Sequence, residues 1–243
     1  LGTCKHVEAV LAQLRTEAPA NVQQRRATVK RPEVRLFYGE QLALAIDLPE
    51  PCFVFHYFNA WDEPDGQVAI LAVRYDRMFD AKHLGPDDSP PLLWRWTIDT
   101  ATGRVHEEQV DDRPAEFPRV ADSVVGLKHR FGYMMRSVKG FLSSDPEKSS
   151  GGIRKYDRQT GTHSDIDFGV GRQGGEPVFA PRANPKSEDD GYLMTYVHDA
   201  NTDTSQLVIM DAASMDDTPV AVVDLPRIPS GFHGSWVPAS VVG

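Results

Sequence analysis

Apolar and polar residues along the chain alternate in short runs, and most of these runs have the length and spacing of β-strands. The strand candidates are residues 52–58, 67–75, 92–98, 104–110, 131–137, 151–156, 176–180, 191–198, 206–211, 218–225 and 232–237. Turn-forming pairs such as Asp65-Gly66, Gly174-Gly175 and Asp190-Gly191 lie between them. We therefore expect an all-β fold from about residue 50 onward.

The first part of the chain has a different pattern. Within residues 7–15 the apolar side chains recur at helical spacing, which predicts a short N-terminal helix. Residues 20–31 are basic and weakly patterned, and a stretch of this kind is more often a solvated, poorly ordered segment than a binding patch. We therefore divide the chain into residues 1–47, with a helix and a poorly ordered segment, and the β-rich residues 48–243.

Three of the expected strands end in an aspartate at a nearly constant interval. Asp99, Asp157 and Asp211 lie 58 and 54 positions apart, and Gly103 and Gly161 close the turns after the first two. An aspartate in such a turn accepts hydrogen bonds from backbone N–H groups two residues on. A period of about 50 residues with four strands per repeat is typical of a β-propeller blade, with a β-sandwich as the alternative. Three to four blades do not close a ring, so a propeller implies further blades outside these residues.

Charge and cysteine content restrict the class of protein. The net charge of -9 argues against a nucleic-acid partner, because phosphate binding requires a basic face. The sequence contains no apolar run of about 18 residues, so we expect no transmembrane helix, and its start lacks the order of a signal peptide. Cys4 and Cys52 lie outside any CxxC motif. We expect both to be reduced thiols in a cytoplasmic protein, with Cys52 packed at the start of a strand.

The most apolar run, FVFHYFNAW at residues 53–61, contains a histidine. A buried imidazole needs a hydrogen-bond partner or a metal, because an unsatisfied polar group in the interior costs about 1–3 kcal/mol. For a single histidine in a strand, a satisfied core residue is the simpler interpretation. A second histidine among aromatic residues, His233 in FHGSW, favours instead a site shared by His56 and His233.

Two glutamates have comparable surroundings. Glu116 in AEFPR and Glu176 in GEPVFAPR each adjoin Phe or Pro at the start of an apolar segment. A buried carboxylate must be paired, so each glutamate either lies at the rim of the fold or has a partner. Taken singly, a solvated residue at a strand end is the simpler interpretation of each.

The four segments FHYFNAW, AEFPR, GEPVFAPR and FHGSW, in this order, resemble the carotenoid cleavage oxygenase family, which includes apocarotenoid and lignostilbene dioxygenases. The resemblance covers about residues 50–243 and implies the C-terminal part of a seven-bladed β-propeller that holds one ferrous iron with four histidines. It implies that His56 and His233 are iron ligands. It also implies that Glu116 and Glu176 accept hydrogen bonds from histidine rings and so orient them, as metal-bound imidazoles require.

The implied reaction is Fe(II)- and O₂-dependent cleavage of a conjugated C=C bond in a carotenoid, apocarotenoid or stilbene, giving two carbonyl products. The family's other two iron histidines belong to a preceding half that these residues do not include, so we expect a truncated chain that is inactive alone. The alternative is a non-catalytic β-propeller-like binding module or the product of a truncated gene. The resemblance also leaves open a peripheral membrane contact, which would need an exposed apolar patch.

The remaining histidines are not expected to bind metal. His6 lies in the helical segment, and polar surroundings predict surface positions for His83, His106, His129, His163 and His198. The aromatic residues Tyr57, Phe58 and Trp61 near His56 either line a substrate tunnel or pack in the core, and packing is the commoner role.

Overall fold

The computed structural model describes residues 33–38, 41–78, 89–137, 151–229 and 233–242. Strands dominate this part of the chain. Two 3-10 turns, at Pro64–Gly66 and Asp122–Val124, lie between strands, and helix α3, at Ala239–Val242, follows the last strand. The strands are β1 Glu33–Tyr38, β2 Gln41–Asp47, β3 Phe53–Glu63, β4 Gln67–Tyr75, β5 Leu92–Asp99, β6 Val105–Asp111, β7 Ala115–Arg119, β8 Phe131–Ser137, β9 Gly151–Asp157, β10 Thr162–Asp167, β11 Arg172–Gly174, β12 Val178–Pro181, β13 Gly191–Asp199, β14 Thr204–Asp211 and β15 Ala221–Leu225. The predicted all-β fold is confirmed.

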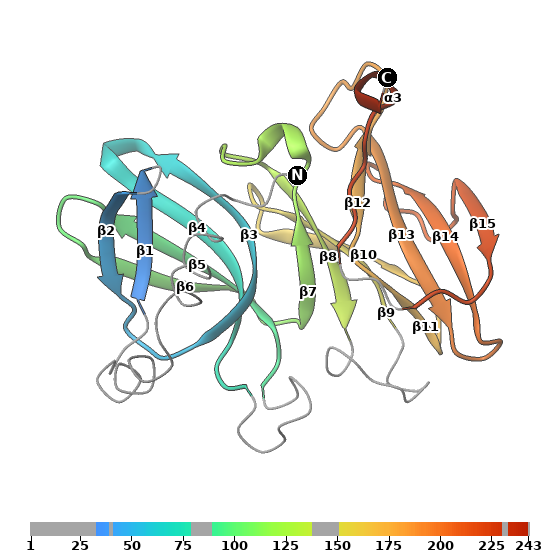
Figure 1. Cartoon of the computed structure of the whole chain (residues 1–243), viewed down its shortest axis with the longest axis horizontal. Helices are drawn as coiled ribbons and strands as arrows, with labels where there is room; N and C mark the ends of the chain where they lie inside the picture. The colour runs from blue at the N-terminus through green and yellow to red at the C-terminus, as the bar shows by residue number, and fades with distance from the viewer. Residues whose placement is uncertain (1–32, 39–40, 79–88, 138–150, 230–232, 243) are drawn as a thin grey trace.

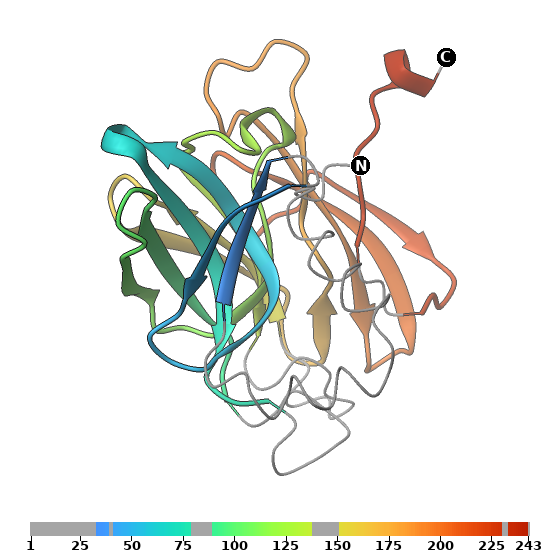
Figure 2. The same cartoon turned by 60° about the vertical axis from the view of Figure 1, so that its left-hand side comes forward.

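Three antiparallel sheets follow one another along the chain. The first contains β3-β4-β5-β6 and the second β7-β8-β9-β10, whereas in the third β11 and β12 both pair with β13, followed by β14 and β15. Figure 1 shows these sheets side by side in chain order, and the turned view in Figure 2 shows the same sequence of sheets. Each sheet has an inner edge (β3 in the first, β7 in the second, and β11 with β12 in the third) and ends with an outer strand, as in propeller blades.

The predicted aspartate repeat marks the end of the third strand in every sheet. Asp99, Asp157 and Asp211 end β5, β9 and β14, and each carboxylate accepts from the backbone N–H groups two and three residues on at 2.9–3.3 Å. Four residues after each aspartate the backbone is left-handed, with φ of 69° at Gly103, 68° at Gly161 and 55° at Met215. The third turn thus has the same geometry without a glycine, which explains why its sequence signal was weaker.

The hydrophobic core lies between successive sheets. Phe58, Trp61 and Leu71 of the first sheet pack against Met134 and Tyr156 of the second. A second cluster joins the next pair of sheets and contains Phe131, Ile153, Leu193, Val208 and Met210. Because the middle strands are covered on both faces, they read as nearly continuous apolar runs. A β-sandwich has two such sheets, so the succession of three favours the propeller interpretation.

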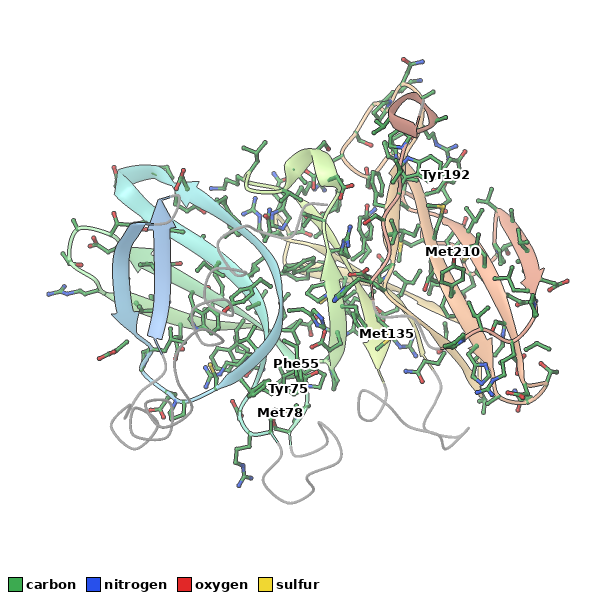
Figure 3. The ribbon with its side chains drawn as sticks, viewed as in Figure 1. Phe55, Tyr75, Met78, Met135, Tyr192 and Met210 are labelled. Atoms are coloured by element: carbon green, nitrogen blue, oxygen red, sulfur yellow. The ribbon has the colours of Figure 1, made fainter. Side chains whose placement is uncertain are left out.

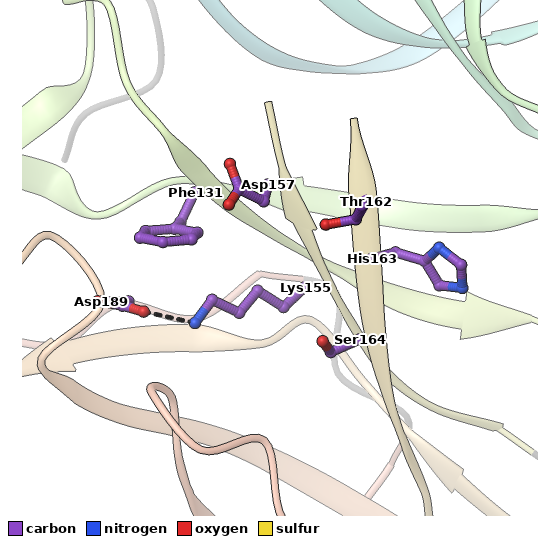
Figure 4. Close-up of a pocket in the computed structure, with 7 residues that line it drawn as sticks. All are labelled: Phe131, Lys155, Asp157, Thr162, His163, Ser164 and Asp189. Atoms are coloured by element: carbon purple, nitrogen blue, oxygen red, sulfur yellow. Dashed lines mark hydrogen bonds and ion pairs between the residues drawn. The ribbon is translucent and has the colours of Figure 1, made fainter. Parts of the chain in front are cut away.

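A polar contact also ties the third sheet to the second. The Lys155 ammonium group lies 2.6 Å from Asp189 Oδ2, donates to the Ala212 carbonyl at 2.8 Å and sits 4.3 Å from the Phe131 ring centroid. Figure 4 shows Lys155 and Asp189 meeting in a small pocket between the two sheets. Glu188 adds a bond by accepting from the Phe131 N–H at 2.6 Å. The loop before β13 therefore fixes the position of one sheet on the next.

The segment predicted to be poorly ordered, residues 20–31, lies outside the described residues, but residues 33–47 contain two strands that were not predicted. They form the antiparallel hairpin of β1 and β2, and Ile46 and Leu48 pack with Ile70 and Trp96 on the far face of the first sheet. The alternation of Leu42, Leu44 and Ile46 with Gln and Ala carried this signal, but it was short and bounded by polar residues. The predicted helix at residues 7–15 lies outside the described residues.

Other differences occur where strands are short or polar. The strand predicted at 232–237 is wrong, because residues 233–238 have no regular structure. The strands β7, β10 and β11 were missed because they are brief, interrupted by proline or rich in polar residues. Cys52 is a free, half-buried thiol next to the start of β3, as predicted. Among the described residues, no helix has both the length and the apolar character needed to cross a bilayer.

Candidate metal centre

The inner strand of each sheet is irregular where a candidate site residue lies. In β3 the register shifts on both sides of Tyr57, so His56 falls in a bulged stretch. In β7 the register shifts between Glu116 and Arg119. In the third sheet the inner edge is split into β11 and β12, with Glu176 in the gap. Bulges redirect side chains out of a regular ladder and occur often at functional sites.

Prolines account for two of these interruptions. Pro118 follows Phe117 in β7, and Pro177 follows Glu176 before β12. Proline has no N–H to donate to a neighbouring strand, so the ladder cannot continue through it. The E-F-P and E-P motifs therefore have a local structural role as well as supplying carboxylates.

His56 and Glu116 form the first pair of the site. His56 Nδ1 lies 2.6 Å from Glu116 Oε2, and the Glu116 side chain is fully buried. The same carboxylate accepts from the Tyr75 hydroxyl at 2.9 Å and from the Phe117 N–H at 2.5 Å. Burial and the Glu116 charge and hydrogen bond raise the pKa of Tyr75 well above its ordinary value, so its hydroxyl remains a donor. Three donors thus satisfy one buried carboxylate.

His233 and Glu176 form the second pair. His233 Nδ1 lies 3.1 Å from Glu176 Oε1, and Glu176 Oε2 accepts from the Gly234 N–H at 2.8 Å. The Glu176 side chain is 5% exposed, whereas that of His233 is 55% exposed. His233 belongs to a segment after β15 that has no strand structure. This segment returns from the outer edge of the third sheet to the inner strands.

The two pairs meet at their histidines. The ring centroids of His56 and His233 are 5.0 Å apart with planes at 79°, and the Phe117 ring lies 4.9 Å from the first and 5.7 Å from the second. An ionised carboxylate only accepts hydrogen bonds, so a neutral imidazole that is bonded to it through Nδ1 carries its proton there and has a lone pair at Nε2. Carboxylate-held imidazoles of this kind are typical metal ligands.

The donor set fits a first-row divalent metal. Neutral imidazoles suit Zn, Cu, Fe and Ni. Two histidines do not complete a coordination sphere, and the part of the chain that the structure describes brings together no group of three or more His, Cys, Asp or Glu side chains suited to a metal. Among the described residues, His56 and His233 could therefore supply only part of the ligands that a metal needs.

One histidine expected at the surface is buried. His129 is 2% exposed, and its Nδ1 lies 3.0 Å from Asn59 Nδ2. The Asn59 side chain also bonds the Val124 and Leu127 carbonyls and so ties β3 to the loop after β7. Burial, and then the nearby Arg158 charge, lower the pKa of His129 to about 4. Asn59 in the apolar run of β3 was the available signal, because a buried amide needs polar partners.

The other candidates are quickly placed. His106 is exposed, His163 and His198 are partly exposed, and His6 and His83 lie outside the described residues. Phe58 and Trp61 are in the core between the first two sheets, so the packing interpretation holds for both.

Comparison with known proteins identifies the class. The chain belongs to the carotenoid cleavage oxygenase family: a family model described as retinal pigment epithelial membrane protein matches residues 27–238, a range that includes β1 and β2. A carotenoid cleavage oxygenase of Mycobacterium tuberculosis is 41% identical over 196 residues, covering 79% of this chain and 39% of that protein. An apocarotenoid-15,15'-oxygenase of Synechocystis is 33% identical, covering 76% of this chain and 38% of that protein. The chain thus spans less than half the length of these relatives.

Solved structures confirm the partial propeller. Cobalt-substituted apocarotenoid oxygenase from Synechocystis superposes with a TM-score of 0.74 at 30% identity, covering 86% of this chain and 44% of that one. A chimera of that oxygenase with the retinal pigment epithelial protein has a TM-score of 0.75 at 29% identity, with the same coverage. The resemblance inferred from the four sequence motifs is therefore confirmed at the level of family and fold.

Proposed function

We propose that this chain supplies His56 and His233 to an Fe(II) centre for oxidative cleavage of a conjugated C=C bond. The observation that carries the proposal is that two histidines 177 positions apart in the sequence meet with ring centroids 5.0 Å apart, each with its Nδ1 on a buried glutamate. The names of the relatives, which include carotenoid and apocarotenoid oxygenases, support a carotenoid or apocarotenoid substrate, with stilbenes as a further option.

The roles of the chain's own residues follow from their contacts. Glu116 and Glu176 hold the Nδ1–H groups and leave both Nε2 lone pairs for the metal; their negative charge also makes the imidazoles stronger donors. Phe117 lies beside both imidazole rings and provides an apolar contact to each. Iron, when bound, would supply open coordination positions for O₂ and a redox-active centre.

Aromatic side chains next to His56 suit an apolar conjugated substrate. Phe53, Phe55 and Tyr57 on β3 are 39%, 38% and 36% exposed. Figure 3 shows Phe55 beside Tyr75, and their ring centroids are 5.5 Å apart. Flat apolar surface of this kind packs well against a polyene or stilbene.

The remaining iron ligands would come from outside these 243 residues. Two neutral imidazoles alone bind a divalent metal weakly, so we expect this chain by itself to hold iron below one equivalent and to cleave no substrate. A chain that binds one equivalent of iron and consumes O₂ with an apocarotenoid or stilbene would contradict this part of the proposal.

A segment exchange tests the catalytic role. The matching segment of the Mycobacterium tuberculosis relative would be replaced by this chain and the hybrid loaded with Fe(II). We expect carbonyl products from a carotenoid or apocarotenoid, loss of cleavage and iron in His56→Ala and His233→Ala, and no loss in His106→Ala, an exposed histidine of β6. A folded hybrid that takes up iron equally well in all variants would contradict the ligand assignment. A folded hybrid that takes up no iron would favour a non-catalytic module.

A further inference from the structure

We propose that Arg119 is a positioning residue for His233: it holds Glu176, and through Glu176 the imidazole, while it ties the C-terminal segment to β7. The inference concerns the geometry of the second histidine–glutamate pair, and its metal-binding consequence rests on the proposed function. It assigns to the last residue of the AEFPR motif a role that the sequence did not reveal.

The contacts of Arg119 reach both parts of the second pair. Its Nη1 lies 3.4 Å from Glu176 Oε2 and donates to the Gly234 carbonyl at 3.2 Å. Its Nη2 lies 3.5 Å from Asp122 Oδ1, which orients the guanidinium from the other side. One side chain from β7 thus contacts the carboxylate that holds His233 and the backbone of the next residue.

The second pair needs such a contact because no strand holds it. His56 lies within β3, whose backbone is fixed by pairing with β4. Among the described residues, His233 lies in a segment without strand pairing, and Glu176 and Arg119 form hydrogen bonds with His233 and Gly234. A guanidinium presents donors in two directions at fixed angles, which a lysine ammonium on a flexible stem does not. Arg119 can therefore hold a carboxylate and a carbonyl at once.

The short strand β7 then positions both histidines. Glu116 binds His56, Arg119 acts on His233, and the bulge between them sets the spacing of these two side chains. Phe117, inside the bulge, touches both rings. The five-residue strand β7 thus contacts two proposed ligands that are 177 positions apart in the sequence.

The test compares Arg119→Met with a matched control, Arg136→Met. Arg136 lies in the same sheet, pairs with Asp167 at 2.7 Å and is 22% exposed, close to the 24% of Arg119. Nitrogen chemical shifts of the imidazoles, measured without metal, report which ring nitrogen carries the proton. We expect Arg119→Met to convert His233 from the Nδ1–H form to a mixture of tautomers and to leave His56 unchanged. Arg136→Met should change neither ring, and Arg119→Lys should restore part of the His233 signature.

A zinc titration of the same variants gives the second readout. We expect Zn²⁺ affinity to fall about tenfold in Arg119→Met, the low end of the effect of removing a partner of a metal ligand. Unchanged His233 shifts in a folded Arg119→Met chain would overturn the inference, and Arg119→Gln is judged by the same criterion if the methionine variant does not fold. If the folded hybrid with the Mycobacterium tuberculosis relative takes up no iron yet Arg119→Met still changes His233, the metal proposal fails while the role of Arg119 stands. If zinc binds the unaltered chain and Arg119→Met with equal affinity, the role of Arg119 fails while the metal proposal stands.

Discussion

The two histidine–glutamate pairs use the same chemistry but differ in what holds them. His56 and Glu116 lie on inner strands of adjoining sheets, 2.6 Å apart, and Glu116 is fully buried with three donors. His233 lies in a strandless segment, is 55% exposed and is 3.1 Å from a glutamate in a gap between two strands. The first pair is part of the contact between two sheets. The second pair lies at the edge of that contact and is held there by polar bonds.

This difference separates stability from site geometry. Disturbing the first pair removes interactions that also hold β3 on β7, so the fold and the site should fail together. Disturbing the second pair should release His233 while the sheets remain packed. The following predictions test this distinction, beginning with the largest effect.

Removing the buried carboxylate should have the largest effect on stability. Glu116→Ala leaves the His56, Tyr75 and Phe117 donors without their acceptor, and each buried unsatisfied group costs about 1–3 kcal/mol, so we expect a loss of about 3 kcal/mol or more. Glu176→Ala should cost about 1 kcal/mol, because the half-exposed His233 can turn to water. Urea unfolding measures both, with the exposed Glu108→Ala as the control. Equal losses at positions 116 and 176 would contradict the comparison.

Acid should lower the stability of the fold through His129. The folded state holds this imidazole neutral, with a pKa of about 4, whereas in the unfolded chain it titrates near 6.5. As the pH falls from 6.5 toward 4 the unfolded state alone gains a proton, so the free energy of unfolding decreases by up to about 1.4 kcal/mol per pH unit. Urea unfolding at pH 7 and pH 5 should show a loss of about 2 kcal/mol in the unaltered chain that His129→Gln removes. Parallel pH profiles for the two chains would show that His129 is not the titrating group.

The backbone between the two pairs provides a third comparison. Phe117 has a φ of 51°, a region that costs a residue with a Cβ about 1–2 kcal/mol and glycine almost nothing. Both Phe117→Ala and Phe117→Gly lose the ring, but we expect the glycine variant to be the more stable by about 1 kcal/mol. Thermal or urea unfolding of the two variants measures the difference. Val222, in the regular strand β15, is the control position, where we expect the alanine variant to be more stable than the glycine variant.

The smallest effect is expected at the second histidine. His233→Ala should change the free energy of unfolding by less than about 0.5 kcal/mol, as is usual for exposed positions. Glu176 keeps the Gly234 N–H and Arg119 as partners in that variant. His56→Ala should lower the free energy of unfolding clearly more, because the buried Glu116 carboxylate then loses one of its hydrogen-bond donors. A His233→Ala chain destabilised as much as His56→Ala would mean that the C-terminal segment belongs to the core.

Local patterns in the sequence predicted the turns and singled out four candidate site residues, which the structure brings together. The turns after Asp99 and Asp157 could be predicted because the hydrogen bonds that these carboxylates accept span only a few residues. The candidate site residues were identified from the order of their motifs and from the neighbouring residues. In each glutamate motif, a proline near the glutamate interrupts the strand. What the motifs could not show is which glutamate meets which histidine. That pairing depends on how the sheets pack, and the structure assigns Glu116 to His56 and Glu176 to His233.

Features that depend on distant contacts were missed. His129 looked like a surface residue because its sequence neighbours are polar. It is buried beside Phe58 and Trp61, and its hydrogen-bond partner Asn59 is 70 positions away. The sequence predicted no role for Arg119, because its partners lie in the third sheet and the C-terminal segment. The 232–237 segment was taken for a strand because it is aromatic, but no neighbouring strand pairs with it among the described residues.

Zinc titration of the chain with ¹⁵N-labelled histidines tests directly whether His56 and His233 face one metal. We expect both rings to carry their proton on Nδ1 before zinc is added, and both Nε2 signals to shift together at the same zinc concentration while Nδ1 remains protonated. The joint shift should disappear in His233→Ala, leaving His56 without a response in the same concentration range. Rings that respond at different zinc concentrations, or through Nδ1, would contradict the shared site.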